Sequence, residues 1–329
     1  MKRNSFLVLL VVIMPLIAVS AVMAEGKKEA AFAAPRYGVD GFVLGAQFRV
    51  AEEKGWFADE NVVPNIQAFS YGVDTIDAIL AGKTDFGVVL DFALLTRLST
   101  QKLVILATII EPEPGWHKLA ARDGISGAAD LVGKKIGVAK GTLQEFVSIK
   151  YLQVNNVPEN KVEFLAFASL FEIVAALKSG KIDAAWVWGQ GTDEVKATKG
   201  LNILVDDSAA KSQSYGFLVV GSDYLNANRA GVEATMKVVN KATGWITGNI
   251  EEASKIIAND VGAPEDRVLS EMKKEHWTLN FRKEHLDSLK ALYKFLRDRD
   301  IIKEDFDIMN LVDLGPLKKA AGDSVVQGL

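Results

Sequence analysis

The sequence of 329 residues contains no cysteine, and only three of its residues are histidine. Without cysteine the chain can form no disulfide bond and cannot be lipid-modified at a lipobox, so its core alone must hold the fold together. The histidines, His117, His276 and His285, have no metal-ligand spacing between them. We expect His276 and His285 on polar helices, exposed to solvent. The sequence therefore predicts no metal site and no cofactor.

Recognisable catalytic motifs are also missing. No G-x-S-x-G nucleophile elbow occurs in the chain. Residues 82–84 (GKT) look like the end of a P-loop, but Ala78 stands where that motif needs its first glycine. Residues 189–191 (GQG) lack the third glycine of a dinucleotide-binding fingerprint, because position 194 is Glu194. We therefore predict that the protein is not an enzyme.

Positive charge is not in excess. The chain carries 38 Lys and Arg against 42 Asp and Glu, which gives a formal net charge of −4. Binding of nucleic acid requires a basic face, so this composition argues against a nucleic-acid partner.

Residues 1–24 have the three parts of a secretory signal peptide. Two basic residues precede an apolar run over 6–19, and small residues follow it up to Ala24. We expect export and cleavage after Ala24, which leaves residues 25–35 as a flexible tether. Cleavage removes two positive side chains and no acidic one, so the net charge changes from −4 to −6. An uncleaved membrane anchor is the alternative, because the apolar run approaches the length that spans a bilayer.

One helix–strand unit occurs twice. Residues 76–89 (IDAILAGKTDFGVV) align without a gap to residues 174–187 (VAALKSGKIDAAWV). Asp85 aligns with Asp183, so the offset is 183 − 85 = 98. Helix-glycine-strand units are common, and chance similarity is the alternative explanation. A repeat of this length that is present only twice predicts two similar α/β lobes and not a solenoid.

Strand-like and helix-like segments alternate from residue 36 to residue 221, which predicts parallel βαβ units. Ser169 with Glu172, and Thr142 with Glu145, have capping-box spacing and predict two helix starts. The densest run of breakers is 111–115 (EPEPG). Beyond residue 223 the chain is expected to be mostly helical.

The loops that follow the predicted strands are the best candidates for a ligand site. In open parallel sheets, ligands bind outside the carboxyl ends of the strands. The five loops are rich in small, polar and aromatic residues, the types that line small-molecule pockets. They are 40–47, 70–72, 90–93, 140–142 and 188–190. Taken singly, each residue could equally serve as a cap, a turn or a packing residue.

Four segments, in order, resemble the nitrate/sulfonate/taurine-type substrate-binding proteins of bacterial ABC importers. They are residues 51–57 (AEEKGWF), 79–87 (ILAGKTDFG), 130–142 (DLVGKKIGVAKGT) and 176–184 (ALKSGKIDA). The similarity covers roughly residues 36–215, and each motif alone is weak. The four motifs together with a signal peptide identify the chain as a member of this family.

The resemblance implies an α/β fold of the type II periplasmic binding protein kind. Each of two lobes would be a mostly parallel sheet flanked by helices, with the ligand cleft between the lobes. Lobe one would hold 36–121 and 221–329, and lobe two 122–220. The two crossings would lie near 122–124 and 216–221. The protein would be a periplasmic monomer that delivers a small molecule to an ABC permease and its ATPase. It would meet the membrane only through its signal peptide or the docked permease.

The resemblance also implies which residues contact the ligand. Those carried over by position, together with neighbouring loop residues, are Phe42, Gln47, Ser70, Tyr71, Asp91, Phe92, Gly141, Thr142, Trp188, Gln190 and Tyr215.

Asp91 departs from the family pattern, since many relatives carry a run of small residues at this position. A carboxylate in the cleft would repel a plain oxyanion, and burying it unpaired is costly. We therefore expect an amine-bearing, zwitterionic or heteroaromatic ligand, with a sulfonate or nitrate-type oxyanion as the alternative. Phe92, Trp188 and Tyr215 could supply flat or cation–π surfaces. The other interpretation of Asp91 is that it caps the helix that begins at Phe92.

Two further functions remain open from the residues. The pyrimidine-synthesising relatives of this family are enzymes, but they use a histidine in the cleft and a cysteine-rich motif. This chain has no cysteine, and we expect none of its histidines in the strand-end loops. A ligand-sensing module of a receptor is the third possibility, and it would need separate partners.

Overall fold

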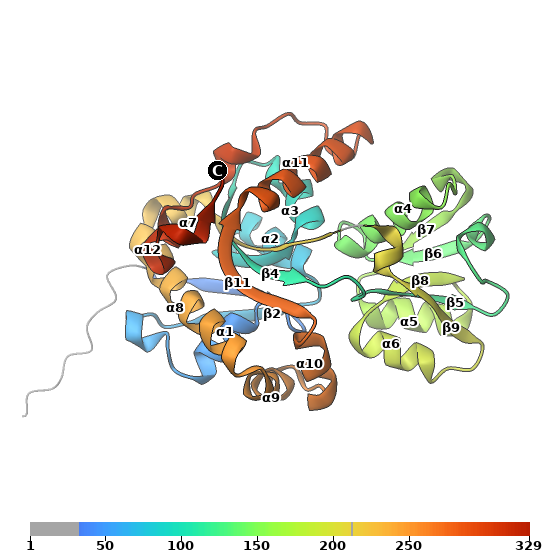
Figure 1. Cartoon of the computed structure of the whole chain (residues 1–329), viewed down its shortest axis with the longest axis horizontal. Helices are drawn as coiled ribbons and strands as arrows, with labels where there is room; N and C mark the ends of the chain where they lie inside the picture. Colours follow the sequence, from blue (N-terminus) through green and yellow to red (C-terminus); the bar gives the residue numbers. More distant parts are fainter. Residues whose placement is uncertain (1–32, 212) are drawn as a thin grey trace, which may run out of the picture.

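The computed structural model describes residues 33–211 and 213–329. They form two lobes side by side, each a sheet flanked by helices (Figure 1). The predicted two-lobed α/β fold class is therefore confirmed. The predicted signal peptide, 1–24, and most of the predicted tether, 25–35, lie outside the described residues. Within 33–211 and 213–329, no helix is long and apolar enough to cross a membrane.

The larger lobe is built on a seven-stranded sheet in the order β12-β11-β4-β10-β3-β1-β2. Its strands are β1 (Arg36–Asp40), β2 (Asn65–Phe69), β3 (Phe86–Leu90), β4 (Leu103–Pro112), β10 (Gly216–Gly221), β11 (Glu275–Arg282) and β12 (Val326–Gln327). Its helices are α1 (Ala46–Glu53), α2 (Gly72–Leu80), α3 (Asp91–Leu98), α7 (Ser222–Ala227), α8 (Arg229–Gly248), α9 (Ile250–Val261), α10 (Glu265–Met272), α11 (Lys283–Asp298) and α12 (Gly315–Ala321).

The smaller lobe has a five-stranded sheet in the order β7-β6-β8-β5-β9. Its strands are β5 (Lys118–Arg122), β6 (Lys135–Val138), β7 (Glu163–Ala166), β8 (Ala184–Val187) and β9 (Leu201–Asp206). Its helices are α4 (Leu143–Val154), α5 (Leu170–Ser179) and α6 (Gly189–Lys196), with short 3-10 turns η2 (Ala128–Leu131), η3 (Glu159–Lys161) and η4 (Asp207–Ala210). Both sheets are mixed, since β10 and β5 pair antiparallel with their neighbours.

The same three-strand unit lies in both lobes, as the sequence repeat predicts. The parallel order β3-β1-β2 in the larger sheet corresponds to β8-β6-β7 in the smaller one. The repeated aspartates have the same role. Asp85 accepts a hydrogen bond from the Arg36 amide (2.9 Å), and Asp183 accepts one from the Lys135 amide (2.8 Å). Each carboxylate fixes the start of the middle strand of its three-strand unit, β1 or β6.

Both predicted helix caps form. The Ser169 hydroxyl accepts from the Glu172 amide, and the Thr142 hydroxyl accepts from the amide of Gln144. The glutamates of the two boxes reach one residue further back than expected. Glu172 accepts from the Ala168 amide (3.0 Å), and Glu145 accepts from the amide of the residue before Thr142 (2.6 Å).

The lobe boundaries differ from the prediction by a few residues. The strand β5 was expected in lobe one, but it pairs with β8 and β9 in the smaller sheet. The strand β10 was expected in lobe two, but it pairs with β3 and β4 in the larger sheet. The chain therefore crosses between lobes at 113–117 and just before Gly216, and not at 122–124 and 216–221. Both strands are short and apolar, and such a pattern does not reveal which sheet a strand joins.

The region after residue 223, which was expected to be mostly helical, also contains the strands β11 and β12. His276 lies on β11, which pairs antiparallel with β4, and its side chain is exposed as predicted. His285 lies on helix α11 as expected, but it is fully buried and not solvated. Its Nδ1 accepts from the Arg282 amide (3.1 Å), and its ring packs on Tyr215 (ring centroids 4.7 Å apart).

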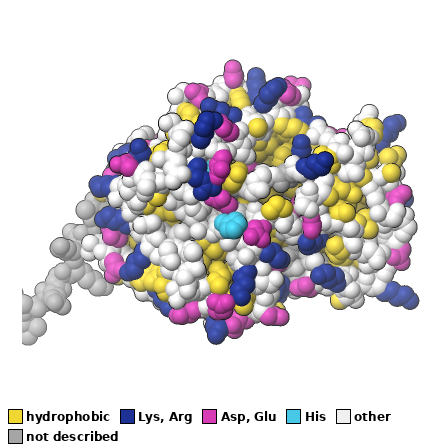
Figure 2. Space-filling model, in the orientation of Figure 1, with side chains coloured by type: hydrophobic (Ala, Val, Ile, Leu, Met, Phe, Trp, Pro, Cys, Tyr) yellow, Lys and Arg dark blue, Asp and Glu magenta, His cyan; other side chains and the backbone are white. Residues whose placement is uncertain are grey.

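The two lobes touch on both sides of the crossings. On the side of α11 and α4, Phe146 from the smaller lobe stacks on Phe92 and meets Phe295 edge-on. Hydrophobic side chains gather at this junction between the lobes (Figure 2). On the side of α10 and α6, the Arg267 and Asp193 side chains approach to 3.9 Å. These contacts describe a state in which the lobes are drawn together.

Candidate functional site

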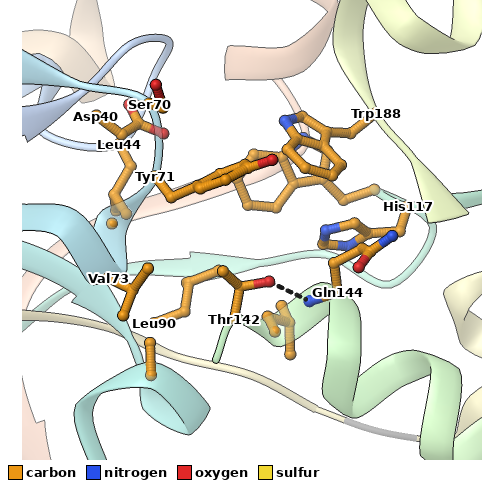
Figure 3. Close-up of a pocket in the computed structure, with 14 residues that line it drawn as sticks. Asp40, Leu44, Ser70, Tyr71, Val73, Leu90, His117, Thr142, Gln144 and Trp188 are labelled. Atoms are coloured by element: carbon orange, nitrogen blue, oxygen red, sulfur yellow. Dashed lines mark hydrogen bonds between the residues drawn. The ribbon is translucent and has the colours of Figure 1, made fainter. Parts of the chain in front are cut away.

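An inner cavity of about 60 Å³ lies between the lobes. Its walls come from the ends of β1, β2, β3 and β8, the first turns of α2 and α4, and the first crossing. The lining residues are Asp40, Leu44, Ser70, Tyr71, Gly72, Val73, Leu90, Ala93, Trp116, His117, Thr142, Leu143, Gln144 and Trp188 (Figure 3). The strand-end loops that the sequence singled out thus enclose one space.

A larger outer cavity of about 380 Å³ adjoins the inner one. The two share Asp40, Ser70 and Trp188 in their walls. The outer lining also mixes apolar, aromatic and polar residues, and it consists of Asp40, Gly41, Phe42, Ala68, Phe69, Ser70, Ser169, Leu170, Phe171, Trp188, Gly189, Gln190, Val261, Gly262, Ala263 and Arg267. A ligand with a compact head and an extended body could occupy both spaces.

Six of the eleven predicted site residues line these cavities. They are Phe42, Ser70, Tyr71, Thr142, Trp188 and Gln190. Their contact with a ligand stays a prediction. The other five, Gln47, Asp91, Phe92, Gly141 and Tyr215, line neither cavity.

Asp91 is held away from both cavities by hydrogen bonds within the protein. Only 1% of the residue is exposed. Its carboxylate accepts from the Phe92 amide (2.8 Å), the Ser214 hydroxyl (2.7 Å) and the Tyr215 amide (3.3 Å). Burial raises the pKa of Asp91 to about 6, against the lowering effect of these bonds. The carboxylate thus connects the start of α3 to the second crossing. The expectation of an amine-bearing ligand rested on a free Asp91 carboxylate in the cleft, so these contacts remove its support.

The remaining four residues have packing or backbone roles. The Gln47 amide nitrogen donates to the carbonyl of Ile109 (2.9 Å) beneath β4. Phe92 and Tyr215 belong to the interlobe and His285 contacts described above. Gly141 has a φ of +78° and turns the chain into α4, a conformation that favours glycine.

The sequence interpretation missed several wall residues. Trp116 and His117 follow the run of breakers at 111–115, which marks the crossing, and this run was the available signal. Gln144 fixes the start of α4, because its side chain accepts from the Ala139 amide (2.7 Å) and donates to the carbonyl of Trp186 (2.9 Å). His117 lies outside the strand-end loops, as expected, but it reaches the inner cavity from the first crossing.

Hydrogen-bond donors converge on the inner cavity. Helices α2, α4 and α6 all begin at its wall, after Tyr71, Thr142 and Trp188. First-turn amides have no acceptor within their own helix, and the positive end of the helix dipole lies there. The Tyr71 hydroxyl and the Trp116 indole nitrogen are buried and have no partner among the described residues. Burial raises the pKa of Tyr71, so its hydroxyl stays a neutral donor at neutral pH.

Aromatic rings form one wall of the site. Trp188 lies 6.1 Å from Tyr71 and 5.3 Å from His117, measured between ring centroids, and the Trp116 ring adjoins His117 at 5.6 Å. Figure 3 shows Tyr71, His117 and Trp188 around the same space, with the Gln144 amide donating to the Thr142 hydroxyl below them. These rings offer flat surfaces to an organic body.

Two carboxylates lie near the cavity. Burial raises the pKa of Asp40 to about 6, although Arg49 and the Phe42 amide favour its charged form. Asp207 lies behind His117. Burial alone would raise the pKa of Asp207, but hydrogen bonds from His117 and from backbone amides hold it below its usual value. The Asp207 carboxylate is 3.2 Å from His117 Nδ1 and 2.9 Å from the His117 amide nitrogen.

One side-chain cluster has a composition that could suit a metal ion. Donor atoms of Glu111, Glu284 and His285 lie within 4.8 Å of one another, away from both cavities. The Arg282 guanidinium already bonds both Glu111 oxygens, at 2.9 and 3.0 Å. Because the Arg282 amide can only donate, His285 Nδ1 must accept, which leaves the proton of the neutral ring on Nε2. This tautomer disfavours metal binding, and the cluster is structural.

Comparison with protein-family models places residues 46–253 in the NMT1/THI5-like family. A Bacillus subtilis (strain 168) protein, provisionally named as an aliphatic sulfonates-binding protein, is 24% identical over 289 residues, which cover 82% of this chain and 83% of that protein. A provisionally named binding protein of Brucella abortus (strain 2308) is 24% identical over 229 residues, which cover 68% of this chain and 70% of that protein.

Solved structures share the architecture. The alkanesulfonate-binding protein SsuA from Xanthomonas axonopodis pv. citri, bound to MOPS, matches with a TM-score of 0.75 at 18% identity, over 87% of this chain and 100% of that one. The periplasmic aliphatic sulphonate binding protein SsuA from Escherichia coli matches with a TM-score of 0.71 at 17% identity, over 85% of this chain and 92% of that one. The desulfurization enzyme DSZB matches with a TM-score of 0.64 at 15% identity, over 87% of this chain and 98% of that one. The chain therefore belongs to the NMT1/THI5-like family and has the two-lobed fold of periplasmic binding proteins.

Proposed function

We propose that this protein is an exported solute receptor that binds a small organic oxyanion between its lobes and delivers it to an ABC importer. The observation that carries the proposal is the convergence of donors on the inner cavity. Three helices begin at the wall of one small space, and the same wall holds Tyr71 and Trp116, whose hydroxyl and indole nitrogen have no partner among the described residues. Such an arrangement suits a compact group with several acceptor oxygens and a negative charge.

A sulfonate-type head fits this donor set, and the larger outer cavity, with Phe42, Phe171 and Trp188 in its wall, has room for the body of the molecule. Three of the proteins above are named for binding sulfonates, which supports the same ligand class here. Asp40 lies at the junction of the two cavities, so a donor or ammonium group on the body would find an acceptor there. We therefore place the oxyanion in the inner cavity and treat a positive group as optional.

Transport without catalysis is the role that the site supports best. His117 is the one histidine in the cavity walls, and among described residues its side chain hydrogen-bonds to Asp207 alone. Within residues 33–211 and 213–329, no serine, threonine or other nucleophile hydrogen-bonds to its side chain, and the chain has no cysteine. An activated nucleophile requires such a contact.

A matched series of ligands tests the proposal. Propanesulfonate, 3-aminopropanesulfonate and propylammonium are compared by thermal shift and calorimetry. Both sulfonates should stabilise the protein, by about 2.7 kcal/mol at a concentration one hundred times the dissociation constant, and propylammonium should not. A thermal shift with propylammonium but with neither sulfonate would refute the oxyanion assignment. So would the absence of any shift with the whole series and with longer sulfonates.

Variants locate the ligand in the cavity. Tyr71→Phe and Trp116→Phe each remove one donor, and each should weaken sulfonate binding by about ten- to one-hundredfold. Tyr293→Phe and Trp245→Phe are matched controls, because neither residue lines the cavities. Equal affinity in all four variants would place the ligand elsewhere.

A further inference from the structure

We propose that His117 binds the oxyanion of the ligand directly and in its protonated form, so that binding takes up a proton. The inference rests on the proposed function, because it concerns the same cavity and ligand class. His117 lines the inner cavity but lies outside the four family-like segments of the sequence.

The position of His117 is fixed from three sides. It lies on the first crossing, immediately before β5, and is 5% exposed. Its ring lies between those of Trp116 and Trp188. Figure 3 shows the imidazole edge directed into the cavity, between Trp188 and Gln144. A side chain so packed cannot turn away from a ligand that fills the cavity.

Asp207 determines which nitrogen faces the ligand. A carboxylate only accepts hydrogen bonds, so the 3.2 Å contact places a proton on Nδ1. The same carboxylate accepts from the Gly115 and His117 amides, so its own position is fixed by the crossing. The nitrogen left for the cavity is Nε2, which has no hydrogen-bond partner among the described residues.

The charge state of His117 then decides how it meets an oxyanion. In the neutral ring, Nε2 presents a lone pair, which repels the oxygens of a sulfonate. In the protonated ring, Nε2 presents an N–H and a positive charge, which bind them. The Asp207 carboxylate stabilises the imidazolium from behind. Proton uptake on binding follows, because the oxyanion selects the protonated ring.

Other titratable groups around the ring are few. Asp207 is on η4, Asp40 lies on β1 across the cavity, and Tyr71 opens α2. Next along the first crossing, Lys118 is 3.3 Å from Asp206 and forms its own pair. Asp40 is the one competitor for the proton, since a protonated Asp40 would also favour an anion. The experiment must therefore separate His117 from Asp40.

The test is calorimetry of propanesulfonate binding between about pH 6 and pH 8, in buffers of different ionisation enthalpy. Propanesulfonate keeps its charge over this range, so any pH dependence belongs to the protein. We expect affinity to fall by at least about tenfold over this range, and proton uptake per ligand to increase with pH toward one at the upper end. This measurement uses the unmodified protein and does not depend on a variant that folds.

Three variants assign the proton. His117→Gln keeps a donor without a titrating charge, and it should bind more weakly at the low end of the range and lose the pH dependence. Asp207→Asn removes the carboxylate that favours the imidazolium, so the fall in affinity should move to lower pH, while Asp40→Asn should retain the pH dependence. Affinity that does not vary with pH, or pH dependence that persists in His117→Gln and vanishes in Asp40→Asn, would overturn the inference while the receptor function stands. Absence of sulfonate binding at every pH would instead refute the function itself.

Discussion

Replacing Gly216 by alanine tests how closely β10 approaches the neighbouring strand β4 beside the inner cavity. Gly216 begins β10 and lies between Leu90 on β3 and Ile110 on β4. A Cβ added there would lie 2.2 Å from Ile110 Cγ2, 3.3 Å from Leu44 and 3.5 Å from Leu90. Carbon atoms in contact prefer about 3.5–4.0 Å, so the Ile110 side chain or the strand must move by more than about 1 Å.

The expected cost follows from the packing of Ile110. This side chain is buried on β4 and β-branched, so it has little freedom to give way. Overpacking of this kind costs about 1–3 kcal/mol, against a gain of about 0.4–1 kcal/mol from the lower entropy of the unfolded chain. We expect net destabilisation of about 1–2 kcal/mol. Leu44 and Leu90 line the inner cavity, so sulfonate affinity should fall as well.

Urea unfolding and thermal melting measure the stability, and calorimetry measures the affinity. Gly244→Ala is the matched control, because nothing lies within 4 Å of an added Cβ in the interior of α8. Alanine favours a helix interior by about 1 kcal/mol over glycine, so this variant should be more stable and bind normally. A Gly216→Ala protein as stable and as tight-binding as the wild type would contradict the described approach of β10 to β4.

Two further substitutions have expected outcomes. Asp91→Asn should leave sulfonate affinity within about threefold, because the carboxylate is engaged by Phe92, Ser214 and Tyr215. A loss of tenfold or more in a well-folded variant would restore Asp91 as a ligand residue. Burial, then Glu271, raises the pKa of Glu275 well above 4.5, so the folded state loses stability as pH rises from that value. Glu275→Gln should raise the melting temperature more at pH 7 than at pH 4, and equal shifts would refute this.

The sequence predicted the scaffold better than the site, and helix starts show why. Ser169 and Thr142 cap their helices through neighbours two or three residues away, so the signal is local. Gly180, with φ of +77°, ends α5 as its position in the repeat predicted. Strand β11 is different, because its partner β4 is more than 150 residues earlier in the chain. The alternation of polar and apolar residues in β11 therefore does not predict a strand unless the partner strand is known.

Side chains around the crossings were the hardest to predict. His285 looks like a solvated helix residue, yet its Nδ1 binds the Arg282 amide and its ring is buried against Tyr215. Trp116 and His117 lie in a stretch whose proline and glycine indicate only a turn. Which residues of a crossing face the cleft depends on which sheet the next strand joins. Tertiary packing decides which sheet the strand joins, and the sequence pattern of one short strand does not predict it.

The two aligned copies of the repeat differ at Asp91 and Gly189, and the expected amine-bearing ligand would have made Asp91 a selectivity residue. The contacts suggest a different reason for the difference. In the larger lobe, Asp91 receives the Tyr215 amide and holds the second crossing. In the smaller lobe the corresponding carboxylate is Asp207, which belongs to the chain leaving that lobe and receives the His117 amide. Each crossing is thus held by one buried acid, but only Asp207 also orients a ring toward the cavity. Asp91 is thus used up by contacts within the larger lobe and the second crossing, while Asp207 positions the His117 ring at the wall of the inner cavity.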